Sequence, residues 1–275
     1  MDLDWKYLLV ALGKVVVLYA MVITIAALMS LAERKVSAWM QYRIGPNRVG
    51  PFGLLQPLAD GVKFLFKEEV LPAGANPMLF RLAPIAAALP AMLTIAVIPF
   101  AGEVVILGKH FGRLSIADLD VGILYLLAIG SMSVYGVILG GWASNSKYSL
   151  LGGLRASAQM ISYELTLILS ILAVIVLAGS LDLRKIADAQ ATIGQWHVWR
   201  QPLAFLLFVI ATFAETNRHP FDFAECEPEL VGGFHTEYSS MKFALFFLGE
   251  YAAMTVMACL TTTLFLGGSS VPFLP

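Results

Sequence analysis

The chain has 275 residues, of which 59% are hydrophobic and 13% are charged, and its formal net charge is −1. So much apolar surface cannot be buried in one soluble core, and the composition therefore predicts a polytopic membrane protein. The small net charge and the absence of a lysine- and arginine-rich run argue against nucleic acid as a partner. Cys226 and Cys259 stand far apart, which excludes a disulfide framework and an iron–sulfur or zinc ligand set, so no metal site is expected.

Runs long enough to cross about 30 Å of hydrocarbon predict six membrane-spanning helices. They cover residues 7–30, 82–101, 121–143, 157–179, 200–214 and 242–266. The expected fold is an all-α bundle of membrane helices that forms a single transmembrane domain over residues 1–275. The start, Met1-Asp2-Leu3-Asp4, lacks the basic residues that lead a cleaved signal, so we expect the first span to remain as a helix.

The basic residues predict how these spans are oriented. Eleven of the 18 lysine and arginine residues fall on one side of the spans, and seven fall on or toward the other. The richer side is expected to be cytoplasmic, or the matrix side in an organelle. The loops 31–81 and 144–156 and the acidic segment after the fifth span then share one compartment, and both termini face outward.

The first inner loop contains a helical pattern of its own. Between residues 54 and 67, polar side chains recur at spacings of four, three and four, and apolar side chains take another face. This pattern predicts an amphipathic helix that lies along the membrane interface. The preceding residues 43–53 are rich in Gly and Pro but lack the Gly-Lys-Ser/Thr ending of a phosphate-binding loop, so they are interpreted as a structural turn.

Two acids interrupt predicted spans: Glu164 lies in the fourth, and Glu250 lies near the middle of the sixth. An unpaired carboxylate costs about 3 kcal/mol on insertion, and such residues usually face the bundle interior and have a function. A salt bridge that only positions helices is the alternative. The uncharged run 201–214 covers only about 21 Å, so Glu215 is expected below the inner surface, where it could form polar steps with Glu164 and Glu250.

The segment that follows the fifth span concentrates negative charge. Arg218 is its only arginine or lysine, against six acids: Glu215, Asp222, Glu225, Glu227, Glu229 and Glu237. Crowding like charges beside a low-dielectric phase pushes some of the pKa values upward, so these carboxylates are candidates for proton handling. His219 and His235 are expected to be structural or solvated. Lys147, Arg155 and Arg218 are interpreted as positive-inside anchors, any of which could pair with an acid.

Several long motifs resemble one known family. They are LAERK at 31–35, YRIGPNRVGP at 42–51, QPLADGVK at 56–63, SKYSLLG at 146–152, QMISYE at 159–164 and AETNRHPFD at 214–222. Together they resemble the H subunit of proton-pumping NADH:quinone oxidoreductase, the respiratory complex I membrane subunit that meets the peripheral arm. The resemblance implies that partner subunits carry flavin and iron–sulfur clusters, while this chain helps to form a lateral quinone channel and starts the proton-coupling path.

The resemblance also implies roles for individual residues. The quinone channel or its mouth would involve Arg34, Arg43, Asp60, Lys63 and Phe221. The carboxylates that couple quinone reduction to proton translocation would be Glu33, Glu164, Glu215, Asp222, Glu225, Glu227, Glu229 and Glu250. The implied location is the bacterial inner (cytoplasmic) membrane, or the mitochondrial inner membrane if the chain is organellar.

The sequence departs from the family pattern at three places. Cys226 and Pro228 are unusual in the acidic segment, and Pro228 disfavours a helical residue at Glu227. The third span has no acid between Asp120 and Trp142, although some relatives place one there. The family usually continues past the position of Pro275 through two further spans and a basic segment, so the sequence is either truncated or given without its end.

Two other function classes remain open at this point. The membrane subunit of a related membrane-bound hydrogenase would use the same acids for ion coupling without a quinone. A stand-alone proton or ion transporter would use intramembrane acids to bind its cargo. Co-purification with a flavin-bearing NADH-oxidising module would exclude the first alternative, and transport by the purified lone chain would support the second.

Overall fold

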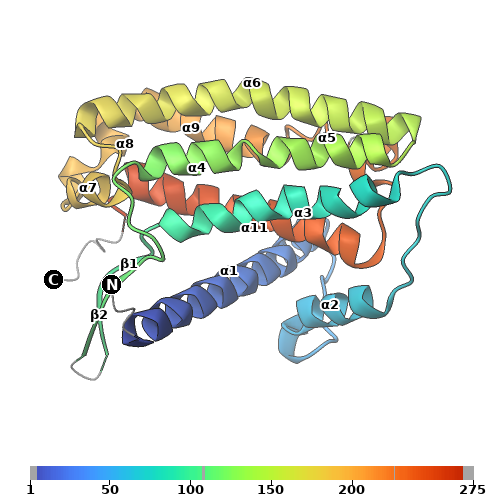
Figure 1. Ribbon diagram of the computed structural model, residues 1–275, viewed down its shortest axis with the longest axis horizontal. Helices are drawn as coiled ribbons and strands as arrows, with labels where there is room; N and C mark the ends of the chain where they lie inside the picture. Colours follow the sequence, from blue (N-terminus) through green and yellow to red (C-terminus); the bar gives the residue numbers. More distant parts are fainter. Residues whose placement is uncertain (1–4, 107–108, 226, 269–275) are drawn as a thin grey trace.

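The computed structural model describes residues 5–106, 109–225 and 227–268, and Figure 1 shows their arrangement. The helices are α1 (Trp5–Met40), α2 (Gln56–Phe66), α3 (Pro77–Thr94), α4 (Gly122–Gly130), α5 (Ser133–Ala143), α6 (Lys147–Ala178), α7 (Leu183–Asp188), α8 (His197–Arg200), α9 (Pro202–Glu215), α10 (Glu227–Leu230) and α11 (Ser240–Phe265). Single 3₁₀ turns cover Pro51–Gly53, Ile95–Val97, Ile193–Gln195 and Gly233–His235. The all-α fold predicted from the sequence is confirmed.

Five helices or helix pairs in the described part of the chain are long and apolar enough to cross a membrane. They are Leu9–Met40, Pro77–Val97, Gly122–Ala143, Lys147–Ala178 and Ser240–Phe265. The remaining predicted span, 200–214, corresponds to the shorter apolar helix α9. The chain is therefore a multi-pass membrane protein with the predicted order of spans.

Two helices are longer than the spans predicted from hydropathy. Helix α1 continues to Met40, ten residues past the predicted end at residue 30, and α6 begins at Lys147 rather than at residue 157. Hydropathy measures only the part of a helix that suits hydrocarbon, whereas backbone hydrogen bonding continues into the polar end turns. As a result Glu33, Arg34 and Lys35 lie on α1 itself and not in a loop.

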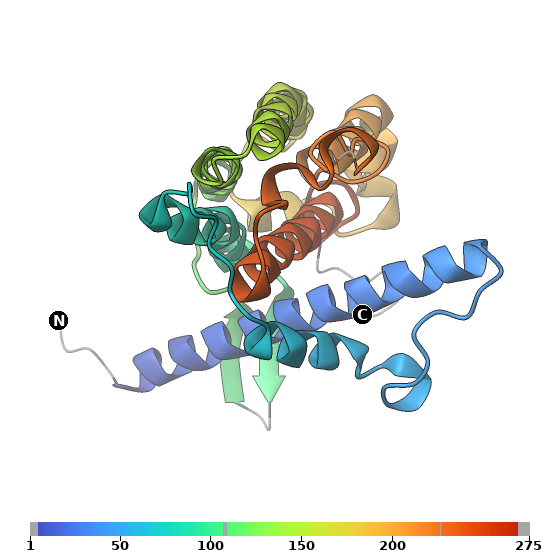
Figure 2. The same ribbon diagram turned by 90° about the vertical axis from the view of Figure 1, so that its right-hand side faces the viewer.

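The long helices pack as a bundle with α1 and α2 along one side (Figure 2). Helix α3 packs on α5 and α11, while α6 packs on α5 and α9. Helix α1 contacts α11 and α2. The buried side chains form two clusters, one around Phe208 and Phe265 and another around Phe80 and Phe234.

The loops predicted to share the inner side gather at one end of this bundle. Figure 1 shows α2 and the turn between α5 and α6 at that end, and β1, β2, α7 and α8 at the other. The backbone N–H of Asn76 donates to the carbonyl oxygen of Ala143, and the Ser239 hydroxyl accepts from the Val70 N–H. The first inner loop thus contacts the end of α5, directly before the loop 144–156, and it also contacts the residues that follow the acidic segment.

A short β-hairpin at the opposite end was not predicted. Strands β1 (Ala101–Ile106) and β2 (Lys109–Leu114) pair antiparallel, with two irregularities in register. The sequence prediction had extended the second span to residue 101, whereas the helical part ends at Val97. Pairing of the two strands satisfies backbone groups where the chain leaves the apolar phase.

Glycine allows the closest helix approaches, as is common between membrane helices. A Cβ added to Gly136 of α5 would lie 2.3 Å from the backbone nitrogen of Ala87 in α3. Likewise, a Cβ on Gly141 would lie 2.5 Å from the carbonyl oxygen of Ser149 in α6. The position of α5 between α3 and α6 therefore depends on residues without side chains.

Replacing Gly136 with alanine is expected to destabilise the protein by about 1–3 kcal/mol, because the new methyl group meets the α3 backbone and not a flexible side chain. The measurement is the midpoint of thermal unfolding in mild detergent. Gly13→Ala is the matched control, because a Cβ on Gly13 meets nothing within 4 Å and alanine favours helix. Equal midpoints for the two variants would contradict this packing argument.

Candidate functional site

The acidic segment is docked on α6. The side-chain amide nitrogen of Gln159 donates to the carbonyl oxygens of Ala214 and Phe221, both at 2.8 Å, and contacts the Asn217 side-chain oxygen at 3.1 Å. The Phe221 ring lies edge-on to Tyr163, with ring centroids 5.3 Å apart. These contacts fix the chain on both sides of Glu215 and directly before Asp222, so α6 holds the backbone near both acids.

The later part of the segment is seated by glycine. Gly233 has a φ of +61°, and a Cβ there would lie 1.7 Å from the carbonyl oxygen of Ala224. A Cβ on Gly152 of α6 would lie 2.7 Å from Gly233. Only glycine fits this crossing without displacing backbone. The segment is therefore held close to the bundle and is not a free loop.

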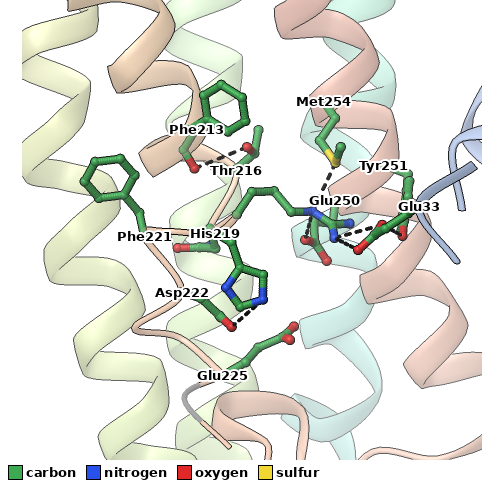
Figure 3. Close-up of polar contacts among 12 residues, drawn as sticks. Glu33, Phe213, Thr216, His219, Phe221, Asp222, Glu225, Glu250, Tyr251 and Met254 are labelled. Carbon is green, nitrogen blue, oxygen red and sulfur yellow. Dashed lines mark hydrogen bonds and ion pairs between the residues drawn. The ribbon is translucent and has the colours of Figure 1, made fainter. Parts of the chain in front are cut away.

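Arg218 joins this segment to α1 and α11, and Figure 3 labels its partners Glu33, Glu250 and Met254. Its Nε lies 2.8 Å from Glu250 Oε1, and its Nη1 lies 3.0 and 3.2 Å from the two carboxylate oxygens of Glu33. The Tyr251 hydroxyl donates to Glu33 at 2.5 Å, and the guanidinium lies 4.6 Å from the centre of the Tyr251 ring. Three separate elements meet at this one side chain.

The charge of Arg218 is well compensated. Only 16% of its side chain is exposed. Burial alone would lower the pKa of a guanidinium, but the Glu250 carboxylate, Tyr251 and Glu33 outweigh that effect and raise the pKa of Arg218. Arg218 was interpreted as a membrane anchor that could pair with an acid. The structure shows that it pairs with two.

A cavity of about 120 Å³ lies between the acidic segment and the helices. Four predicted coupling acids line it: Glu164, Glu215, Glu225 and Glu250. Apolar side chains form most of the remaining wall, together with Ser131, Ser133 and Thr216. Glu164, Glu215 and Glu250, which the sequence placed at different depths, thus line a single cavity. This cavity reaches from the inner end into the bundle.

The junction between α4 and α5 contributes the hydroxyl groups of Ser131 and Ser133 to this cavity. The predicted span 121–143 is divided there, and Gly130, Ser131 and Ser133 all line the cavity. The Ser131 hydroxyl donates to the carbonyl oxygen of Ala128 at 3.1 Å. Serine and backbone groups thus provide polarity in a span whose sequence has no acid between Asp120 and Trp142.

The acids at the inner edge differ in their partners. Glu225 accepts from His235 across 3.0 Å, and this hydrogen bond lowers the pKa of Glu225 against the opposing effect of burial. Burial raises the pKa of Asp222, and the Glu225 carboxylate raises it further. The Asp222 Oδ2 lies 3.6 Å from His219. Neighbouring carboxylates therefore have proton affinities shifted in opposite directions.

Four of the eight predicted coupling acids have no described place on the cavity: Glu33, Asp222, Glu227 and Glu229. Glu229 forms an ion pair with Arg155 at 2.6 Å and is 60% exposed. The backbone of Glu227 belongs to α10, but its side chain, like the whole of Cys226, lies outside the described residues. The structure therefore brings together only some of the eight predicted coupling acids.

The predicted quinone-channel residues fall into two places. Arg34 of α1 pairs with Asp60 of α2 at 2.6 Å, and Lys63 lies 3.9 Å from the same carboxylate. Arg43 donates to the side chain of Gln41 in the turn after α1. Phe221 lies instead on the acidic segment, and Figure 3 shows it and Glu33 at opposite sides of the view.

Comparison with known proteins shows the family of the chain. A sequence model of the family described as NADH dehydrogenase matches residues 13–275. The chain belongs to this family. It is 56% identical over 263 residues to the NADH-quinone oxidoreductase H subunit numbered 2 of Geobacter sulfurreducens, covering 96% of this chain and 79% of the relative.

Two further relatives have similar names. The chain is 53% identical over 269 residues to subunit 8 of the NADH-quinone oxidoreductase of Rhodothermus marinus, covering 96% of this chain and 75% of the relative. It is 50% identical over 280 residues to the NADH-quinone oxidoreductase H subunit of Leptospira biflexa, with 98% and 78% covered. The resemblance to the H subunit of NADH:quinone oxidoreductase inferred from the motifs is confirmed.

Sequence reasoning missed parts of the site in this NADH dehydrogenase family member. Gln159 was noted only within a motif, although it anchors the acidic segment. His235 was expected to be structural or solvated, but it donates to Glu225. Tyr251 was noted only as a polar neighbour of Glu250, whereas its hydroxyl binds Glu33. The one available signal was Arg218, the sole arginine or lysine among six acids.

Replacing His235 with phenylalanine is expected to raise the pKa of Glu225, because the ring shape is kept but the hydrogen bond that lowers this pKa is lost while burial remains. In the wild type this bond stabilises the fold above the carboxyl pKa of the unfolded chain, and its contribution is lost as pH falls through the lowered folded pKa. The variant should lack that contribution. The measurement is a pH titration of the carboxyl infrared band, assigned with Glu225→Gln.

His219→Phe is the matched control for this titration. His219 is 85% exposed and is the smallest named influence on the pKa of Glu225. Its loss should move the band much less. An unchanged band in His235→Phe would show that the hydrogen bond does not set the proton affinity of Glu225.

Proposed function

We propose that this chain is the membrane subunit of a proton-pumping NADH:quinone oxidoreductase that forms the quinone access channel with peripheral-arm subunits. In this proposal it also begins the coupling of quinone reduction to proton translocation. Flavin and iron–sulfur clusters belong to partner subunits, and the setting is a bacterial inner membrane, or the mitochondrial one. The names of the relatives support this proposal over a membrane-bound hydrogenase or a stand-alone transporter.

One observation carries the coupling part of the proposal: Arg218 contacts Glu33 of α1 and Glu250 of the cavity at the same time. Opposite charges 4 Å apart interact by about 4 kcal/mol at an effective dielectric constant near 20. A difference of about 1.4 kcal/mol already changes an equilibrium tenfold. A small movement of the guanidinium between its two partners therefore suffices to redistribute protons.

The cavity supports a route for those protons. Glu250 is joined to Arg218 and shares the cavity with Glu225, Glu215 and Glu164. One carboxylate oxygen of Glu215 is buried and has no hydrogen-bond partner among the described residues. Acids that line one cavity titrate as a coupled set when the charge on one changes the energy of the others. The proposed role of this set is to receive protons when the charge near Glu33 changes.

An aromatic row supports the quinone part of the proposal. The ring centroids of Phe64 in α2 and Phe243 in α11 are 5.9 Å apart, and those of Phe243 and Phe247 are 5.8 Å apart. Tyr251 then lies 4.8 Å from Phe247 and binds Glu33. Aromatic faces bind a planar ring by stacking, and apolar walls suit its isoprenoid tail. The row leads from the amphipathic helix to the acid network.

Charged residues are proposed to surround the mouth of this route. Arg34, Asp60 and Lys63 form one group where α1 meets α2, and Arg43 lies in the turn between them. Several apolar side chains of α2 are exposed there, including Leu58 and Phe66. We propose that Phe221 lines the route farther in, beside the acidic segment.

Replacing Asp222 with asparagine, or Glu225 with glutamine, is expected to lower coupled quinone reduction in the assembled enzyme by about tenfold or more, because a proton-accepting group is lost from the path. Assembly should survive, since each change keeps the size of the side chain. The measurement is NADH-dependent quinone reduction in membranes together with proton uptake. Asp120→Asn is the control, because Asp120 is 88% exposed at the opposite end of the bundle. Full activity in both variants would remove these acids from the proposed path.

A photoreactive quinone analogue is expected to label peptides that contain Arg34 or Asp60, with Phe221 as a further predicted position. The physical reason is that the aromatic row begins beside α2, where the mouth is proposed. Mass spectrometry of the cross-linked, digested enzyme is the measurement, and an excess of unlabelled quinone should abolish the labelling. Labelling confined to other subunits would exclude the channel role.

A further inference from the structure

The attachment of α2 to the rest of the protein is unusual. None of its eleven residues, all described, is buried. A helix without a buried face gains little from hydrophobic packing, so its position depends on other contacts. Because the proposed mouth lies beside α2, whatever holds this helix also sets the shape of that mouth.

Two consecutive serines at the start of α11 hold the C-terminal end of α2. The Ser240 hydroxyl lies 2.9 Å from the carbonyl oxygens of both Phe64 and Lys67. The preceding Ser239 hydroxyl accepts from the Val70 N–H at 3.1 Å. The last carbonyl groups of a helix have no partner within the helix, so these contacts satisfy groups that would otherwise need water.

The backbone at Ser240 indicates that these contacts constrain the chain. Ser240 has a φ of +56°, a conformation that a residue with a side chain rarely adopts, and it is 6% exposed. Such a conformation costs free energy and persists where the surrounding contacts fix it. Here the contacts that accompany it are those of the Ser240 hydroxyl, whose single proton is shared between the carbonyl oxygens of Phe64 and Lys67 at the end of α2.

A charged contact and a ring contact join the same two helices. Lys242 forms an ion pair with Glu69 just beyond α2, and its ammonium group lies 4.8 Å from the centre of the Phe80 ring. Phe64 meets Phe243 one residue farther along α11. At its other side, α2 is tied to α1 by Arg34 and Asp60. The three helices therefore form a frame around the beginning of the aromatic row.

We propose that Ser240 is a positioning residue which, with Ser239 and Lys242, fixes the C-terminal end of α2 on α11 and thereby holds open the quinone access route between α2 and α1. This inference rests on the proposed channel function. The inference adds that the start of α11 fixes the C-terminal end of α2 and so positions the proposed mouth. The same helix carries Glu250 and Tyr251. Access and proton coupling would then share one rigid helix.

Ser240→Ala and Ser240→Gly, each in the assembled enzyme, test the inference. Both remove the hydroxyl, but glycine also relieves the positive φ, so a shared effect belongs to the hydroxyl. We expect the KM for a short-chain quinone to rise by about three- to tenfold in both variants, as for the loss of a typical hydrogen bond, with kcat changed less than about twofold. Hydrogen exchange of the amides of residues 64–70 should be faster.

Thr262→Ala is the matched control, because Thr262 is an exposed residue of α11 whose hydroxyl bonds only within its own helix, to Ala258. It should leave KM and exchange unchanged. Reduction of a water-soluble acceptor by the NADH-oxidising part reports assembly. Unchanged exchange or unchanged KM in both serine variants would overturn the inference, as would a glycine variant that behaves like the wild type.

The channel proposal and this inference fail in distinguishable ways. Photolabelling of the wild type that is confined to other subunits would remove the channel and the inference with it. Labelling at α1 or α2, combined with an unchanged KM in both serine variants, would overturn the positioning role alone. Labelling at α1 or α2 with a raised KM and faster exchange would support both.

Discussion

The ion pairs of Arg218 are the interaction on which the site depends. A guanidinium that is 16% exposed beside an apolar phase needs partners, and removing one partner from a buried pair typically costs about 3–5 kcal/mol. Its partners come from α1 and α11, while Arg218 itself belongs to the acidic segment. Pairing therefore fixes the segment against both helices. In this arrangement Glu225 and Glu250 line the same cavity.

The acids of the segment are distinguished by their surroundings more than by their sequence spacing. Glu225 has a histidine donor, Asp222 is buried near another carboxylate, and Glu229 lies at the surface with Arg155. The pKa of Asp222 is thus raised and that of Glu225 lowered, although the two carboxylates are only three positions apart.

Local patterns in the sequence predicted the order of the spans, the amphipathic helix α2 and the gathering of the charged loops at one end. They underestimated the lengths of α1 and α6, because hydropathy does not detect helical turns that extend beyond the hydrocarbon. The partners of Arg218 could not be predicted in this way. Arg218 and Glu33 are 185 positions apart, and no local period reports a contact formed only when α1 packs on α11. The docking of α2 by Ser239 and Ser240 was missed for the same reason, since it links residues more than 165 positions apart.

Two successive residues of α1 connect the parts of the site. Adjacent residues on a helix point about 100° apart, so Glu33 and Arg34 cannot serve the same neighbour. Glu33 faces Arg218 and Tyr251, whereas Arg34 faces Asp60 of α2. A rotation or shift of α1 that follows quinone binding at the mouth would therefore move both contacts together. On the proposed function, one turn of α1 thus links quinone binding near the Arg34–Asp60 pair directly to the Glu33–Arg218 pair.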